Sequence, residues 1–250
     1  MIRRHPLVAF FVLAYALTWW VYPLLFISPL IGLLGLFGPA LAAIIVTALT
    51  EGRAGVGVLL RRLVHWRVPL PWWLAALGLP ALLSLVAAVL YAVGWSSGVT
   101  LGRLTALELV LVVLVAGEEL GWRGYALPGL LERFSPLVAS VVLGLLWALW
   151  HLPTFFIPGT PQYGFSIPAF LVMTTGYSIL RTWVWQPTGG SVLVATLAHG
   201  MINVSQGFFL AGVEPALRYP VLAVSWGAAG VVLGLLLRTR TPRPVSVPAA

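Results

Sequence analysis

A succession of long apolar runs constrains the fold of this chain more than any other feature. A helix of roughly 20 apolar residues spans the hydrocarbon core of a bilayer. Backbone polar groups in lipid must be satisfied within the segment, which favours helices. The sequence therefore predicts an all-α polytopic membrane protein of about eight transmembrane helices, with six or seven still open. The predicted spans cover residues 7–27, 30–50, 70–93, 104–124, 136–157, 166–186, 190–210 and 219–237.

The composition agrees with a membrane protein and argues against a nucleic-acid partner. Hydrophobic residues make up 60% of the chain and charged residues 8%, against roughly 25% charged residues in a soluble domain. The net charge of +8 could suggest nucleic acid. All the basic residues are arginines, however, and they lie in short loops between apolar runs, where they set orientation in a membrane. We therefore expect membrane lipid around the chain and no nucleic acid.

The arginines also predict the orientation. If the N-terminus is cytoplasmic and the spans alternate, only Arg103 and Arg218 of the 14 basic residues lie outside. Positive charge accumulates on the cytoplasmic side of membrane proteins. We therefore expect a multi-pass protein of the inner (plasma) membrane with both termini cytoplasmic. The twelve arginines assigned to the cytoplasmic side are Arg3, Arg4, Arg53, Arg61, Arg62, Arg67, Arg123, Arg133, Arg181, Arg238, Arg240 and Arg243.

The chain shows no internal domain boundary. We predict one transmembrane domain over residues 1–237 and a Pro-rich, disordered cytoplasmic tail over residues 238–250. The first apolar run is expected to be a retained helix, because bulky Trp19 and Trp20 stand where a signal peptide would have small residues. The basic stretch 52–68 is either an interfacial helix or a plain loop that holds orientation.

Ionisable and amide side chains interrupt three of the apolar runs. Ionisable groups cost at least about 2.5–3.5 kcal/mol each at the centre of a membrane helix, so they are functional candidates by default. The interrupting side chains are Glu118, Glu119 and Arg123 in the fourth run, His151 in the fifth, and His199 and Asn203 in the seventh.

The spacing of these residues predicts their roles. Glu119 and Arg123 are four residues apart, so they share a helix face and can pair. Glu118 is turned by about 100° from Glu119, so it can face a different cavity and act as a general base. A purely structural ion pair at a helix end is the alternative for Glu119 and Arg123.

The other two segments supply imidazoles and an amide. His199 and Asn203 share one helix face, and Trp147 precedes His151 by four residues, so its ring can pack on the imidazole. Each piece alone could be interhelical packing or hydrogen bonding. Together, a carboxylate, two imidazoles and an amide can activate water and stabilise an oxyanion, which predicts one shared polar site.

The depths in the membrane that the predicted spans give to these residues conflict with one shared site. At about 1.5 Å per residue, His151 lies near the outer end of its predicted span, whereas Glu118 lies nearer the cytoplasm and His199 at mid-depth. The three agree only if the fifth span is tilted or begins below the interface, or if the fourth is longer. We expect the predicted boundaries to be the error.

The three segments together resemble the CAAX prenyl endopeptidase and bacteriocin-processing family of intramembrane proteases. That family has the motif EExxxR on one helix, FxxxH on a later one and HxxxN on a third. The resemblance covers roughly residues 110–210, and the protease-like core of the transmembrane domain is expected over about 104–210. A tryptophan stands here where the family usually has phenylalanine. The matching residues are Glu118, Glu119 and Arg123, then Trp147 and His151, then His199 and Asn203.

The resemblance implies an intramembrane endopeptidase that cleaves membrane-associated protein or peptide substrates near the cytoplasmic side. By position, Glu118 and His151 would activate the attacking water, and His199 and Asn203 would stabilise the oxyanion. Glu119 and Arg123 would hold the helix end, with Trp147 beside them.

Two alternatives to this interpretation stay open. Family members have been described both as metalloproteases and as metal-independent glutamate proteases. The absence of HExxH and of cysteine favours an enzyme without a cofactor. Zinc held by Glu118, His151 and His199 is the alternative. A non-proteolytic immunity factor or transporter could instead use the same polar cluster for binding.

Overall fold

The computed structural model describes residues 2–95 and 98–239, and within them every regular element is helical. Shorter 3₁₀ turns join several of the α-helices, and a π-helical segment, Leu120–Ala126, links α6 to α7. The α-helices are α1 Pro6–Trp19, α2 Gly32–Gly35, α3 Gly38–Arg61, α4 Leu70–Trp95, α5 Ala106–Leu114, α6 Ala116–Glu119, α7 Leu127–Leu131, α8 Pro136–Trp150, α9 Ile167–Trp185, α10 Val192–Phe209 and α11 Pro215–Arg238.

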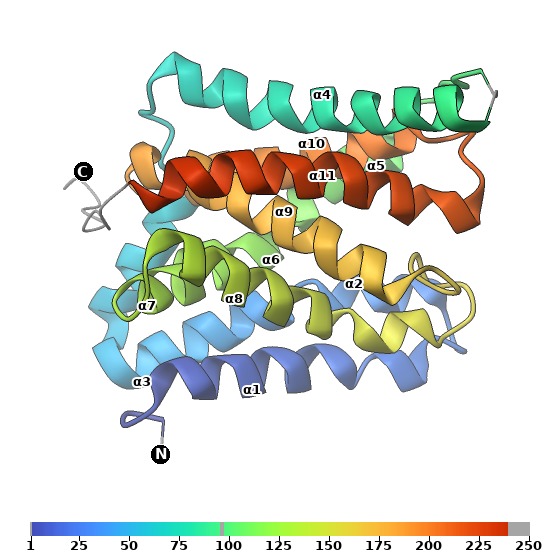
Figure 1. Cartoon of the computed structure of the whole chain (residues 1–250). Helices are drawn as coiled ribbons and strands as arrows, with labels where there is room; N and C mark the ends of the chain where they lie inside the picture. The colour runs from blue at the N-terminus through green and yellow to red at the C-terminus, as the bar shows by residue number, and fades with distance from the viewer. Residues whose placement is uncertain (1, 96–97, 240–250) are drawn as a thin grey trace.

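The helices form one bundle through which the chain passes back and forth. Figure 1 shows the beginning of α1 and the end of α11 at the same end of the bundle. The main helix pairs are α1 with α3, α8 with α9, α9 with α11, and α10 with both α4 and α5. Segments distant in sequence therefore meet in the interior.

The bundle confirms the prediction of an all-α polytopic membrane protein. Within the described residues, five helical segments are long and apolar enough to cross a bilayer, and α8 is a shorter apolar helix. The count of about eight spans stays a prediction, since α5–α7, α8 and α9 are outside this set. The five segments are Pro6–Leu24, Gly32–Val64, Leu70–Trp95, Val192–Phe209 and Pro215–Arg238.

The fourth and fifth predicted spans have the wrong boundaries. The predicted helix over 104–124 is divided into α5, α6 and the π-helical segment, and helical structure continues to Leu131. The helix predicted to reach residue 157 ends at Trp150, with His151 as its C-cap. Pro153 explains this end, because proline lacks an N–H and disfavours helical geometry in the residue before it.

The basic stretch 52–68 begins as a helix that forms the second part of α3. Gly52 has a left-handed φ of 70°, and the chain bends there before helical structure resumes as far as Arg61. Glycine suits this position because it adopts positive φ without steric cost. A plain loop is therefore wrong for residues 53–61. The predicted tail from residue 240 onward lies outside the described residues.

Two glycines bring α6 and the π-helical segment into direct contact with the start of α3. A Cβ atom on Gly117 would lie 2.9 Å from the carbonyl oxygen of Leu36, and one on Gly121 would lie 2.5 Å from the Pro39 ring. Small residues permit such close approach between membrane helices. The contact fixes the position of the intervening residues, among them Glu118.

We predict that Gly121→Ala destabilises the fold. The added methyl group would overlap Pro39, and overpacking of this kind typically costs about 1–3 kcal/mol. Gly78→Ala is the matched control, because Gly78 lies in α4 and a methyl group added there would have no atom within 4 Å. Thermal unfolding in detergent should show a lower midpoint for Gly121→Ala alone. Equal midpoints would contradict the close packing.

Candidate active site

A cavity of about 560 Å³ opens among α1, α2, α5, α8, α9 and α10. It is lined by side chains from all three polar segments of the sequence, namely Glu118, Trp147, His151, His199 and Asn203. Segments that lie up to 85 residues apart thus meet at one place. The prediction of one shared polar site therefore agrees with the geometry, while the catalytic roles remain predictions.

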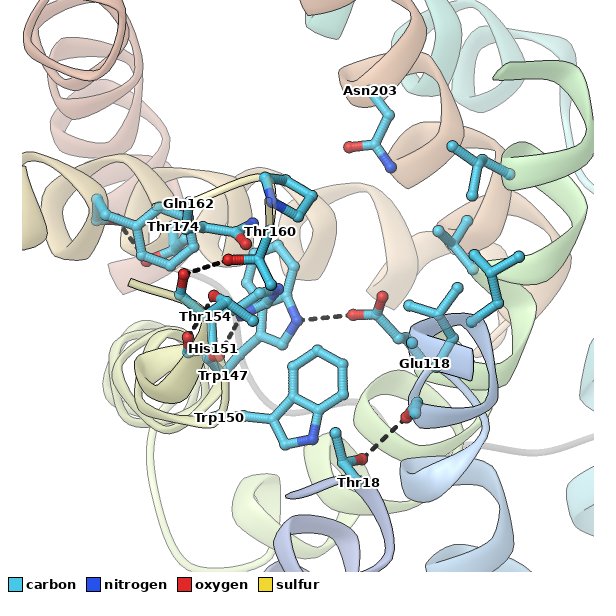
Figure 2. A pocket seen from close by; sticks show the side chains of 18 of the residues that line it. Thr18, Glu118, Trp147, Trp150, His151, Thr154, Thr160, Gln162, Thr174 and Asn203 are labelled. Carbon is cyan, nitrogen blue, oxygen red and sulfur yellow. Dashed lines mark hydrogen bonds between the residues drawn. The ribbon is translucent and has the colours of Figure 1, made fainter. Parts of the chain in front are cut away.

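Glu118 is held in the wall of this cavity by a tryptophan. Its side chain extends from α6 and is only 3% exposed. The indole Nε1–H of Trp147 donates to Glu118 Oε2 at 2.9 Å, as Figure 2 shows. The sequence predicts only that an aromatic ring at position 147 packs on the imidazole. The hydrogen bond to the carboxylate is a contact that phenylalanine, the family's usual residue, could not make.

His151 is fixed at the end of α8 with one ring nitrogen engaged. Its Nδ1 lies 2.9 Å from the carbonyl oxygen of Trp147, and a carbonyl only accepts, so Nδ1 carries the proton. The ring packs edge-on against Trp147, Trp150 and Phe170. In the neutral imidazole, Nε2 is then the basic nitrogen and can accept a proton in the cavity.

Glu119 is the centre of a buried ion network beneath the cavity. Its Oε1 accepts from Arg123 Nη1 at 3.3 Å, from Arg181 Nη1 at 2.6 Å and from His199 Nδ1 at 2.8 Å. The side chains of Glu119 and both arginines are fully buried. The charges of Glu118, Glu119 and the two arginines cancel, which meets the need to compensate ions removed from water.

Glu119 also orients His199 toward the cavity. Because a carboxylate only accepts, the Nδ1–H of His199 donates to Glu119, and Nε2 is left for the cavity. A neutral His199 therefore presents an acceptor there. It can donate to an oxyanion only as an imidazolium, with protons on both nitrogens. The predicted role of His199 depends on this protonation state.

Asn203 lies one helical turn beyond His199 on α10. Its side chain is exposed, lines the cavity, and makes no hydrogen bond with any group in residues 2–95 or 98–239. Figure 2 shows its amide pointing into the space above Glu118. The alternative that His199 and Asn203 only hold helices together by packing or hydrogen bonding does not suit the Asn203 side chain, which has two free N–H donors for a ligand.

Arg181 is buried in the interior of the bundle. Its position near the end of a predicted span assigns it to the cytoplasmic side, and that assignment stays a prediction. The structure buries its side chain completely, with the guanidinium 4.3 Å from the centre of the Trp147 ring and bonded to Glu119. The sequence does contain a signal for this burial, since an ionisable residue within an apolar run is itself a functional candidate.

The depth conflict among the three segments is resolved by the helix boundaries and a tilt. Figure 1 shows α8 and α9 running obliquely to α1 and α4. Helix α8 has only 15 residues, and the break after α5 redirects the chain that carries Glu118. His151, at the end of α8, consequently reaches the same cavity as Glu118 and His199.

The described residues do not form a ready zinc site. Both imidazoles have Nδ1 engaged and Nε2 free, a pattern typical of zinc ligands with an outer partner. Among the described residues, however, no three His, Asp or Glu side chains are close enough together to hold a metal ion. Glu118, His151 and His199 therefore do not fit zinc as they stand.

Comparison with known proteins supports the resemblance seen in the motifs. Residues 101–205 match the family model described as type II CAAX prenyl endopeptidase Rce1-like. A protein of Methanococcus maripaludis named CAAX prenyl protease 2 is 35% identical over 105 residues. This alignment covers 39% of the present chain and 39% of the relative. The predicted resemblance is confirmed over residues 101–205. This segment contains every residue of the site named above, Arg181 included.

We predict that Arg181→Met destabilises the protein. The substitution removes one partner of a buried carboxylate, and breaking a buried pair in this way costs about 3–5 kcal/mol. Arg103→Met is the matched control, because Arg103 is exposed and outside the network. Unfolding of the purified variants in detergent should separate them clearly. If Arg181→Met were as stable as the control, Glu119 would not depend on this arginine.

Proposed function

We propose that this chain is an intramembrane endopeptidase that hydrolyses peptide bonds with a water activated by Glu118 and His151. The observation that carries the proposal is the convergence of a buried carboxylate, two oriented imidazoles and a free amide on one cavity. A binding site needs no such set. The matches to a CAAX prenyl endopeptidase model and to a CAAX prenyl protease support the same reaction class.

Glu118 and His151 are the proposed bases. Glu118 keeps Oε1 available because Trp147 engages Oε2, and His151 keeps Nε2 available because Trp147 engages Nδ1. A water between them gives a proton to Glu118 as its oxygen attacks the peptide carbonyl, while His151 orients it. Burial keeps bulk water from competing at the reacting centre. The same tryptophan therefore positions both groups.

Asn203 and His199 are the proposed stabilisers of the tetrahedral oxyanion. The Asn203 amide donates whatever the pH, whereas His199 donates through Nε2 only as an imidazolium. Fixed donors aimed at the developing charge are often the largest catalytic contribution. When the intermediate collapses, the C–N bond breaks and the proton held by Glu118 passes to the leaving amine. The products are a carboxylic acid and an amine.

Glu119, Arg123 and Arg181 act as positioning residues in this mechanism. They touch no substrate, since all three side chains are fully buried. Through the hydrogen bond at 2.8 Å, Glu119 fixes the ring of His199 and directs Nε2 into the cavity. The proposed substrates are membrane-associated proteins or peptides, and the proposed location is the inner (plasma) membrane.

We predict that Glu118→Gln abolishes cleavage while leaving the fold intact. The amide is nearly isosteric but cannot accept the proton, and loss of a general base costs about 10²–10⁴-fold in rate. The purified protein would be incubated with a quenched-peptide library in detergent. Glu132→Gln is the matched control, since Glu132 is exposed at the far end of the bundle.

The outcomes of this assay separate the alternatives. Cleavage that is lost in Glu118→Gln, retained in Glu132→Gln and resistant to chelation supports the metal-free mechanism. Cleavage that is lost on chelation and restored by zinc would indicate that Glu118, His151 and His199 are metal ligands. Full activity of folded Glu118→Gln would contradict the proposal.

We further predict that Asn203→Ala lowers kcat by about 10²–10³-fold, the usual effect of removing one oxyanion donor. KM and the thermal unfolding midpoint should change little, because the Asn203 side chain has no hydrogen-bond partner in the described part of the chain. Steady-state kinetics and a melting curve test both points. A large drop in the midpoint would indicate a structural role instead.

A further inference from the structure

The cavity lies at the opposite end of the bundle from the start of α1 and the end of α11. The cavity wall includes the connection after α1, at Tyr22 and Leu25, and the connection after α8, at Pro158–Gln162. Helices α1 and α8 both begin at the end of the bundle where α11 ends, so these connections lie at the other end (Figure 1). The end with these two connections is the cavity end, and the end with the start of α1 and the end of α11 is the terminal end.

The charged residues are distributed very unevenly between the two ends. Eight described arginines and two glutamates lie at the terminal end, against two arginines and two glutamates at the cavity end. The net charges are thus +6 and zero. At the terminal end these are Arg3, Arg4, Glu51, Arg53, Arg61, Arg62, Arg67, Glu132, Arg133 and Arg238; at the cavity end they are Arg103, Glu108, Glu214 and Arg218.

Positive charge near the ends of membrane helices is retained on the cytoplasmic side. From this bias we infer that the terminal end is cytoplasmic and that the cavity opens toward the extracytoplasmic face. Cytoplasmic termini and cleavage near the cytoplasmic side, both expected from the sequence, cannot hold together. The arginines favour the first, because they lie in short connections or near the ends of helices, where the charge bias is most reliable.

The lining of the cavity indicates what enters from that face. Leucine and valine side chains line the cavity on the side of α2 and α5, among them Leu33, Leu36 and Leu111. Polar uncharged side chains, such as Thr160 and Gln162, lie toward the cavity end. Among the described lining residues Glu118 is the only Asp, Glu, Lys or Arg, so there is no arginine to pair with an acidic substrate.

The substrate assigned by this geometry is an uncharged, largely apolar polypeptide segment presented from the extracytoplasmic face. The membrane-proximal part of a membrane protein or an exported peptide has this chemistry. A cytoplasmic C-terminus does not reach the cavity in this orientation. The assignment of a substrate rests on the proposed peptidase function, whereas the orientation of the cavity does not.

The natural absence of cysteine permits a direct test of orientation. Single cysteines would replace Phe26 and Tyr163 at the cavity end, and Trp66 and Glu132 at the terminal end; all four side chains are exposed. A membrane-impermeant maleimide would be applied to spheroplasts and to inverted vesicles that contain the full chain. Each variant would also be labelled in detergent as a measure of thiol reactivity.

We expect Phe26→Cys and Tyr163→Cys to label in spheroplasts, and Trp66→Cys and Glu132→Cys only in inverted vesicles. The reverse pattern would overturn the inference, and so would labelling of each pair from both sides. A cysteine that does not react in detergent is replaced in the comparison by the second position at its end. None of these substitutions touches the proposed catalytic residues.

A second measurement separates this inference from the proposed function. Two reporters would carry the same cleavable segment next to one membrane anchor, facing either the cytoplasm or the outside. We expect cleavage of the outward reporter alone, lost in Glu118→Gln. Cleavage of the inward reporter alone would overturn the inference and leave the peptidase intact. The expected labelling with no Glu118-dependent cleavage would instead overturn the proposed function and leave the orientation intact.

Discussion

The carboxylate of Glu119 is the group on which the arrangement of the site depends. One oxygen accepts hydrogen bonds from α10 and α9 and from the π-helical segment that follows α6, through His199, Arg181 and Arg123. A buried carboxylate without these partners would cost several kcal/mol. The bonds therefore hold together three parts of the chain that are distant from one another in the sequence. They also set the tautomer of His199 and the direction of its ring.

Trp147 links this network to the cavity above it. Its ring lies against the guanidinium of Arg181, its indole N–H reaches Glu118, and its backbone carbonyl engages His151. One residue thus connects the buried charges with both proposed bases. The close contacts of Gly117 with Leu36 and of Gly121 with Pro39 fix the same region. Few side chains are consequently free to shift without moving the groups that face the cavity.

The local sequence was enough to identify most of the site. Spacing of four residues predicted the pairing of Glu119 with Arg123, and the geometry confirms it. The motifs likewise named Trp147, His151, His199 and Asn203, all of which line the cavity. Arg181 was missed because its partner lies 62 residues away, on a different helix. A pairing within one helix can be predicted from spacing, whereas a pairing between helices depends on how they pack.

The sequence by itself determined that the chain forms apolar helices for a membrane and that polar groups interrupt three of them, because hydropathy and helical periodicity are local properties. Tertiary structure alone decided that α8 runs obliquely, that Arg181 and His199 join Arg123 on Glu119, and that the cavity lies at the opposite end of the bundle from the start of α1 and the end of α11. Those features arise from contacts between distant segments, above all the need to compensate buried charge, and no local pattern specifies which distant partner meets that need.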